Sequence, residues 1–111
     1  MKQIKISFWI ATLLVLLLAL PVLAHKVNLF AYAEGGTIYT ESYFPDGRPV
    51  AGGKVLVFDS AETRRLEGTT DKEGLFNFKI PKVDDLRIVI EATMGHNNDF
   101  TLKQSEIEAG Q

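Results

Sequence analysis

Apolar and polar residues alternate at every second position in several short stretches of this chain. In the third quarter of the sequence, Phe76, Phe78 and Ile80 alternate with Asn77 and Lys79. Side chains of a β-strand point to opposite faces in turn, so this period of two predicts a strand with one aromatic face. Such a face needs a second layer of structure to cover it.

Residues 66–81 as a whole predict one β-hairpin that contains this strand. Asp71 opens and Gly74 closes a four-residue stretch with the residue preferences of a type I turn. Pro81 ends the second strand because it has no N–H to donate. An isolated hairpin is only marginally stable in water, so we expect the rest of the chain to supply a second sheet.

Other stretches rich in β-branched, aromatic and alternating apolar residues predict further strands, which turn-forming residues separate. The stretch 54–60 is apolar on both faces, so we expect it in the middle of a sheet. The predicted strands cover residues 25–33, 37–44, 54–60, 65–70, 75–80, 86–94 and 99–103. The predicted core contains Leu56, Phe58, Phe76, Phe78, Ile88 and Ile90.

No stretch after residue 24 places apolar residues at helical spacing, so we expect no helix there. About seven short strands separated by frequent turns are typical of an all-β fold, here a single antiparallel β-sandwich of the immunoglobulin-like or prealbumin-like kind. We therefore predict a β-sandwich domain at residues 25–104. Residues 105–111 are polar and are expected to form a flexible C-terminal tail.

Residues 1–24 have the pattern of a signal peptide or a membrane anchor. Two lysines precede an uncharged stretch from Ile6 to Ala24, and Val22 and Ala24 fit the −3 and −1 positions of a signal-peptidase site. Cleavage there would make His25 the first residue of the mature protein. Without cleavage, the apolar stretch would extend roughly 28 Å as a helix, enough to span a bilayer. Both alternatives predict an exported, periplasmic or extracytoplasmic domain, because the lysines stay inside.

The composition excludes several classes of function. The chain has no cysteine, so disulfides, thiolate metal sites and thiol catalysis are excluded. The net charge is −2 and no basic patch stands out, which argues against nucleic acid and against an anionic membrane surface. The sequence also shows no Ser-His-Asp arrangement and no phosphate-binding loop. We therefore expect no enzyme activity and no organic cofactor.

The two histidines, His25 and His96, are the candidate metal ligands. After cleavage, the α-amine and imidazole of His25 could chelate one metal ion, and the imidazole of His96 could complete a three-nitrogen site for nickel, copper or cobalt. His96 follows a predicted strand in a glycine-containing loop at a sheet rim. The alternative is that His25 only begins a strand and His96 is a solvated loop residue, because sequence spacing cannot prove that they meet.

Other candidate ligands have a simpler structural explanation. Met94 is in phase with Ile88 and Ile90, which favours core packing over a thioether ligand. Glu41 and Glu91 could supply oxygen ligands, but each also fits the exposed face of its strand. An aromatic group is assigned to the core or the sheet surface rather than to ligand stacking; it comprises Phe30, Tyr32, Tyr39 and Tyr43.

Part of the sequence resembles a known family of sandwich domains. Residues 47–58 read Gly-Arg-Pro-Val-Ala-Gly-Gly-Lys-Val-Leu-Val-Phe, and residues 68–78 read Gly-Thr-Thr-Asp-Lys-Glu-Gly-Leu-Phe-Asn-Phe. This pattern resembles the carboxypeptidase regulatory-like, prealbumin-type β-sandwich modules. The resemblance implies the fold and says almost nothing about function.

A second resemblance covers most of the mature chain. The stretches 24–31, beginning Ala-His, 39–44, Tyr-Thr-Glu-Ser-Tyr-Phe, and 94–96, Met-Gly-His, resemble the small extracytoplasmic accessory component, the L component, of energy-coupling-factor nickel/cobalt transporters. The resemblance implies Ni²⁺ or Co²⁺ as the transported ligand, membrane permease subunits as partners, and a metal role for His25 and His96. The single apolar segment leaves open whether the domain is tethered or released.

Three classes of function follow from these observations. The first is a module that binds or hands over Ni²⁺ or Co²⁺ outside the cytoplasmic membrane. The second is a non-metal β-sandwich interaction module that docks on an envelope or transporter protein. The third is a copper-dependent enzyme using the chemistry of His25, which the small chain with no convergent acid or tyrosine disfavours.

Overall fold

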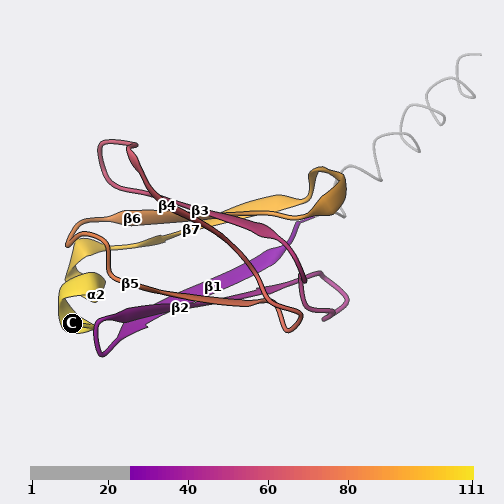
Figure 1. Cartoon of the computed structure of the whole chain (residues 1–111), viewed down its shortest axis with the longest axis horizontal. Coiled ribbons are helices and arrows are strands. Elements are labelled where there is room, and N and C mark those ends of the chain that lie inside the picture. Colours follow the sequence, from indigo (N-terminus) through magenta and orange to yellow (C-terminus); the bar gives the residue numbers. More distant parts are fainter. Residues whose placement is uncertain (1–25) are drawn as a thin grey trace, which may run out of the picture.

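The computed structural model describes residues 26–111, and two antiparallel sheets lie face to face in it (Figure 1). The strands are β1 (Asn28–Glu34), β2 (Thr37–Tyr43), β3 (Lys54–Phe58), β4 (Arg64–Thr69), β5 (Leu75–Lys79), β6 (Leu86–Glu91) and β7 (Asn97–Leu102). A 3₁₀ helix η2 (Thr93–Gly95) lies between β6 and β7, and a short helix α2 (Gln104–Ala109) follows β7.

The strands divide between a three-stranded sheet, in the order β1-β2-β5, and a four-stranded sheet, in the order β4-β3-β6-β7. Every strand pair is antiparallel. Ile38 is opposite Phe78 in one sheet, and Val55 is opposite Ile90 in the other, so apolar side chains share the inner face of each sheet. The prediction of an all-β, single antiparallel sandwich of seven strands is confirmed.

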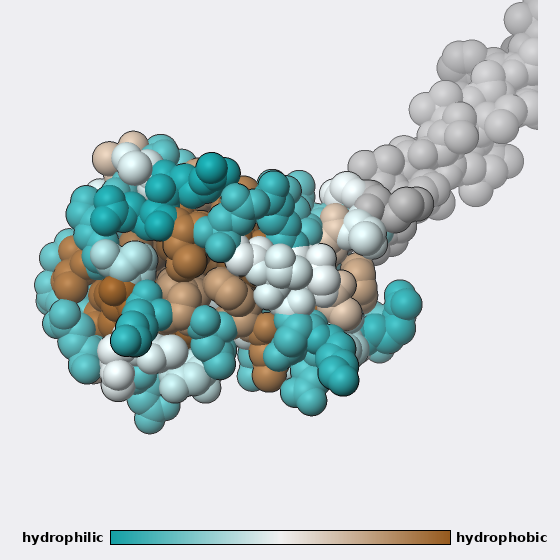
Figure 2. Space-filling model, in the orientation of Figure 1, coloured by the Kyte–Doolittle hydropathy of each residue, from teal (hydrophilic) through white to brown (hydrophobic). Residues whose placement is uncertain are grey.

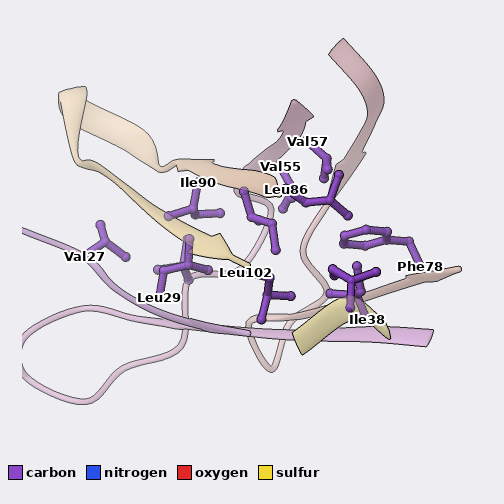
Figure 3. Packing of buried hydrophobic residues seen from close by; sticks show 12 residues of the cluster. Val27, Leu29, Ile38, Val55, Val57, Phe78, Leu86, Ile90 and Leu102 are labelled. Atoms are coloured by element: carbon purple, nitrogen blue, oxygen red, sulfur yellow. The ribbon is translucent and has the colours of Figure 1, made fainter. Parts of the chain in front are cut away.

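The hydrophobic core lies between the two sheets (Figure 3). The predicted core residues Phe78, Ile88 and Ile90 are buried, and Phe76 is partly buried against them. In the space-filling view, hydrophobic residues are visible between the sheets, and hydrophilic residues cover much of the four-stranded sheet (Figure 2). The buried apolar residues are Val27, Leu29, Ile38, Val50, Val55, Val57, Phe78, Leu86, Ile88, Ile90, Leu102 and Ile107.

The prediction that Leu56 and Phe58 belong to the core is wrong. Val55 and Val57 are 1% and 0% exposed and face inward, so Leu56 and Phe58 point to the outer face of β3. Both faces of this strand are apolar, so alternation alone could not choose between them. The guanidinium of Arg87 lies 4.6 Å from the ring centre of Phe58 and shields it from water.

The prediction of one hairpin over residues 66–81 is also wrong, although its turn exists. The carboxylate of Asp71 accepts the N–H of Leu75 at 3.0 Å. However, β4 pairs with β3 and β5 pairs with β2, so this turn carries the chain from one sheet to the other. The hydroxyl of Thr70 donates to the carbonyl of Val50 at 2.6 Å, and its backbone N–H donates to the carbonyl of Gly53 at 2.8 Å, so the end of β4 stays beside the segment that leads into β3.

Both η2 and α2 contradict the expectation of no helix after residue 24. Residues 105–111 do not form the expected flexible tail, because α2 packs on the sandwich. Ile107 is fully buried, and the carbonyl of Gly110 accepts the N–H of Gly36 at 2.8 Å. A six-residue helix with one buried side chain shows no helical period in the sequence.

The predictions for residues 1–24, as a signal peptide or anchor, and for His25 lie outside the described residues. Within residues 26–111, no helix is long and apolar enough to cross a membrane.

Candidate functional site

His96 lies at one end of the sandwich, in the connection between β6 and β7. The helix η2 leads into it, and Gly95 adopts a φ of +76°, which glycine tolerates far better than other residues. The N–H of Ala92 donates to the carbonyl of His96 at 2.7 Å and closes the loop. The structure thus places His96 in a glycine-containing loop at a sheet rim, as the sequence indicates.

The ring of His96 contacts an aromatic ring from a distant part of the chain. The ring centres of Phe44 and His96 are 6.0 Å apart at 85°, an edge-to-face arrangement. The guanidinium of Arg48 lies 5.2 Å from the centre of the Phe44 ring. The turn after β2 therefore places an aromatic ring beside the imidazole and a cation beside that ring.

Arg48 is held in this position by Asp46. Its Nε donates to the Asp46 carboxylate at 2.7 Å, and its backbone N–H donates to the same carboxylate at 3.0 Å. These bonds, the backbone one first, hold the pKa of Asp46 below its ordinary value of 3.8. Asp46 is therefore ionised at neutral pH, and both of its carboxylate oxygens accept hydrogen bonds from Arg48.

The start of the described chain reaches the same end of the molecule. The side-chain amide of Asn98 donates to the carbonyl of Val27 at 2.6 Å. Val27 is the second described residue, and Asn98 follows His96 by two positions. We call this end the histidine rim and define it by residues 26–27, 44–48 and 93–98.

The other predicted ligands do not join His96 in a metal site among the described residues. His25 lies outside them, so the structure does not test the predicted histidine pair. Within residues 26–111, no three side chains of His, Cys, Asp or Glu form a group that could hold a metal ion. Glu41 lies on the outer face of the three-stranded sheet, and Glu91 lies at the end of β6 in the other sheet.

Tyr43 forms a polar pair with Glu41 on β2. Its hydroxyl donates to the Glu41 carboxylate at 3.4 Å. Burial raises the pKa of Tyr43 above its ordinary value of 10.0, and the negative charges of Glu41 and Glu73 raise it further. Tyr43 is thus a protonated donor at neutral pH.

The outer face of the three-stranded sheet carries exposed aromatic rings. Phe30 is 56% exposed and Tyr32 is 51% exposed. Tyr32 stacks on Tyr39 of the neighbouring strand, with ring centres 5.2 Å apart. The sequence allows either the core or the sheet surface for this aromatic group, and the structure places Phe30 and Tyr32 on the sheet surface.

Sequence reasoning missed Phe44, Arg48 and Asn98 as neighbours of His96 and of the chain start. The Pro-Asp-Gly stretch at residues 45–47 indicates a turn, but only the folded structure shows that this turn meets the β6–β7 connection. Asn98 had no signal in the sequence, because asparagine is common in loops for local reasons.

The fold and the histidine rim define this chain as a small all-β sandwich domain with a histidine at one end. No family model matches the sequence, and no solved structure matches the fold. A curated protein of Haemophilus influenzae, described as uncharacterized, is 34% identical over 88 residues, which are 77% of this chain and 55% of that protein. The chain thus spans about half the length of this relative.

Proposed function

We propose that this protein is the extracytoplasmic accessory component of a nickel/cobalt uptake transporter, which binds Ni²⁺ or Co²⁺ and hands it to a permease subunit. His25 and His96 are the proposed ligands. The proposal involves no chemical reaction. It draws on the resemblance of residues 24–31, 39–44 and 94–96 to the L component of energy-coupling-factor transporters.

One structural observation carries this proposal: the 2.6 Å hydrogen bond between Asn98 and Val27. Val27 follows His25 by two positions, and Asn98 follows His96 by two positions. The bond ties the chain start to the loop of the second histidine. The bond supports the proposal because it holds the residue two positions after His25 close to the residue two positions after His96.

The donor chemistry agrees with the proposed metals. An α-amine and two imidazoles are nitrogen donors of intermediate softness, and such donors suit Ni²⁺ and Co²⁺ better than Mg²⁺ or Ca²⁺. The edge contact of Phe44 orients the ring of His96, and the N–H of Ala92 fixes its backbone. Because the loop is already partly ordered, less conformational entropy is lost when it binds a metal ion.

Calorimetric titration of residues 25–111 with Ni²⁺ tests the proposal. This form is suitable because the buried apolar residues of the described chain lie between Val27 and Ile107. We expect saturable binding below the millimolar range, with a large loss of affinity in His96→Ala. The matched control is Asn97→Ala, the exposed next residue, at the start of β7. No saturable binding, or unchanged binding in His96→Ala, would rule out the site.

The second candidate function is a non-metal interaction module that docks on an envelope or transporter protein. The exposed rings of Phe30 and Tyr32 favour it, because large exposed aromatic side chains often mark contact surfaces. Protein cross-linking through a label on this sheet, in cells with and without added nickel, separates the two functions. Metal-independent capture of a permease without Ni²⁺ binding in vitro would favour the second.

A further inference from the structure

The two outer faces of the sandwich differ in chemistry. On the three-stranded sheet, outward-pointing positions of β1 and β2 form what we call the aromatic face, made of Phe30, Tyr32, Tyr39 and Tyr43. These residues alternate with the buried residues Leu29, Ile38, Thr40 and Ser42, so they point away from the core. Phe30 and Tyr32 are more than half exposed, so this face presents aromatic rings to water.

The four-stranded sheet has a charged outer face instead. Lys54 pairs with Glu67 at 3.1 Å across β3 and β4, and Arg87 reaches Asp99 at 4.0 Å across β6 and β7. The aromatic residue on this side, Phe58, is covered by the guanidinium of Arg87. Water therefore meets charged groups and a covered ring on one side of the molecule, and on the other side it meets uncovered rings that lie among Glu34, Glu41 and Lys79.

The position of the aromatic face in the chain indicates what covers it. The apolar stretch of residues 6–24 ends six positions before Phe30 and eight before Tyr32. Even a fully extended chain spans only about 20 Å over six residues. If residues 6–24 enter the bilayer, β1 is held next to the lipid surface.

We propose that the aromatic face lies on the surface of the membrane into which residues 6–24 insert, with its rings at the level of the lipid headgroups. Tyrosine and other amphipathic aromatic side chains favour that level, because one end is apolar and the other is wet. Glu34 and Glu41 on this sheet outnumber Lys79, so the surface it fits is zwitterionic rather than anionic. The proposal is independent of metal binding, since His96 lies at the end of the sandwich.

A second copy of this chain is a poorer occupant. Two strands of seven residues and one of five, spaced about 4.8 Å apart, give a flat sheet area of only about 300 Å². A stable protein interface needs about 800 Å² from each partner. A lipid surface has no such threshold, because the inserted segment supplies most of the attachment and raises the effective concentration of the face. After cleavage, the same rings would hold the released domain more weakly.

Spin labelling of the full chain in phosphatidylcholine vesicles tests this docking. The chain has no cysteine, so one introduced cysteine gives one label. Asn77→Cys places the label opposite Tyr39 on the aromatic face, and Thr101→Cys places a matched label on the exposed side of β7. We expect the collision rate of a water-soluble relaxation agent to be severalfold lower at position 77 than at position 101, and the difference to vanish when Phe30→Ser and Tyr32→Ser are combined.

Three results would overturn the proposal. The first is an equal collision rate at both labels in vesicles, which would mean that the aromatic face does not lie on the lipid surface. The second is shielding at position 77 that also occurs without lipid and grows with protein concentration, which would identify a second copy as the occupant. The third is shielding that survives the combined serine variant. Flotation of the same samples establishes that the chain is membrane-inserted in each measurement.

Discussion

The side-chain amide of Asn98 donates a 2.6 Å hydrogen bond to the backbone carbonyl of Val27. This bond joins the segment just before β1 in one sheet to β7 in the other. It closes the side of the sandwich at which the described chain begins, and it places that beginning beside the loop of His96. The histidine rim therefore depends on a contact between residues 71 positions apart in sequence.

Removing this hydrogen bond should weaken the attachment of the segment just before β1 to the sandwich. Asn98→Ala leaves the carbonyl of Val27 without its donor, and we expect a loss of about 1–2 kcal/mol in the free energy of unfolding. Amide hydrogen exchange of Leu29 should accelerate more than that of Ile88. Asn97→Ala, at an exposed neighbouring position, should change neither; equal effects in both variants would contradict the assigned role.

Metal binding should depend on the residue at which the mature chain begins. An N-terminal extension turns the α-amine of His25 into an amide, so an extended protein should fold normally and lose much of its Ni²⁺ affinity. Titrations of the extended and native-start proteins compare the two. If their affinities are equal, the α-amine of His25 is not a ligand.

The same chelate should compete with protons. Amines and imidazoles in general take up protons between about pH 8 and 6, and only their unprotonated forms bind metal. We expect the affinity of residues 25–111 for Ni²⁺ to weaken steeply over this range. A flat profile in calorimetric titrations at several pH values would exclude nitrogen ligands.

The buried aromatic ring of β5 should contribute strongly to stability. Phe78 is 8% exposed, so Phe78→Ala leaves a cavity between the sheets and should cost about 3–5 kcal/mol. Chemical denaturation measures this cost. Phe30→Ala is the matched control, because its ring is 56% exposed and its removal should change stability little. Similar costs for both variants would show that the faces are assigned wrongly.

Acid should destabilise the protein partly through Asp59. This carboxylate is 3% exposed and accepts the N–H groups of Thr63 and Ala61, each at 3.0 Å. These bonds, that of Thr63 first, and the cation of Lys82 hold the pKa of Asp59 below its ordinary value of 3.8. A lowered folded-state pKa contributes stability that is present above the unfolded value and is lost as pH falls through the folded value.

Thermal unfolding of Asp59→Asn between pH 7 and 2 measures this contribution. The variant should be less stable than the native protein at pH 7, and the gap should narrow below about pH 3.8. Glu108→Gln, on the exposed side of α2, is the control and should show no such narrowing. A gap that stays constant with pH would mean that the charge of Asp59 is not linked to folding.

The alternation of residues by itself determined the strands and much of the core. Phe76, Phe78, Ile88 and Ile90 repeat every second position with polar neighbours on most intervening sites, and a strand has only two faces to which this pattern can correspond. The glycine before His96 likewise placed that histidine in a loop. These are local properties, because φ, ψ and side-chain direction are set within a few residues.

Tertiary structure decided which apolar face of β3 is inside, which sheet each strand joins, and what His96 touches. Leu56 and Val57 satisfy the local pattern equally, and the valines face inward in the structure because they lie opposite Ile90 and Ile88 of β6, which face the core. The turn at Asp71 has the same residues whether its strands pair or separate. Pairing is chosen by the burial of the whole core and by distant bonds such as Thr70 to Val50 and Asn98 to Val27, whose free energy no local stretch of sequence contains.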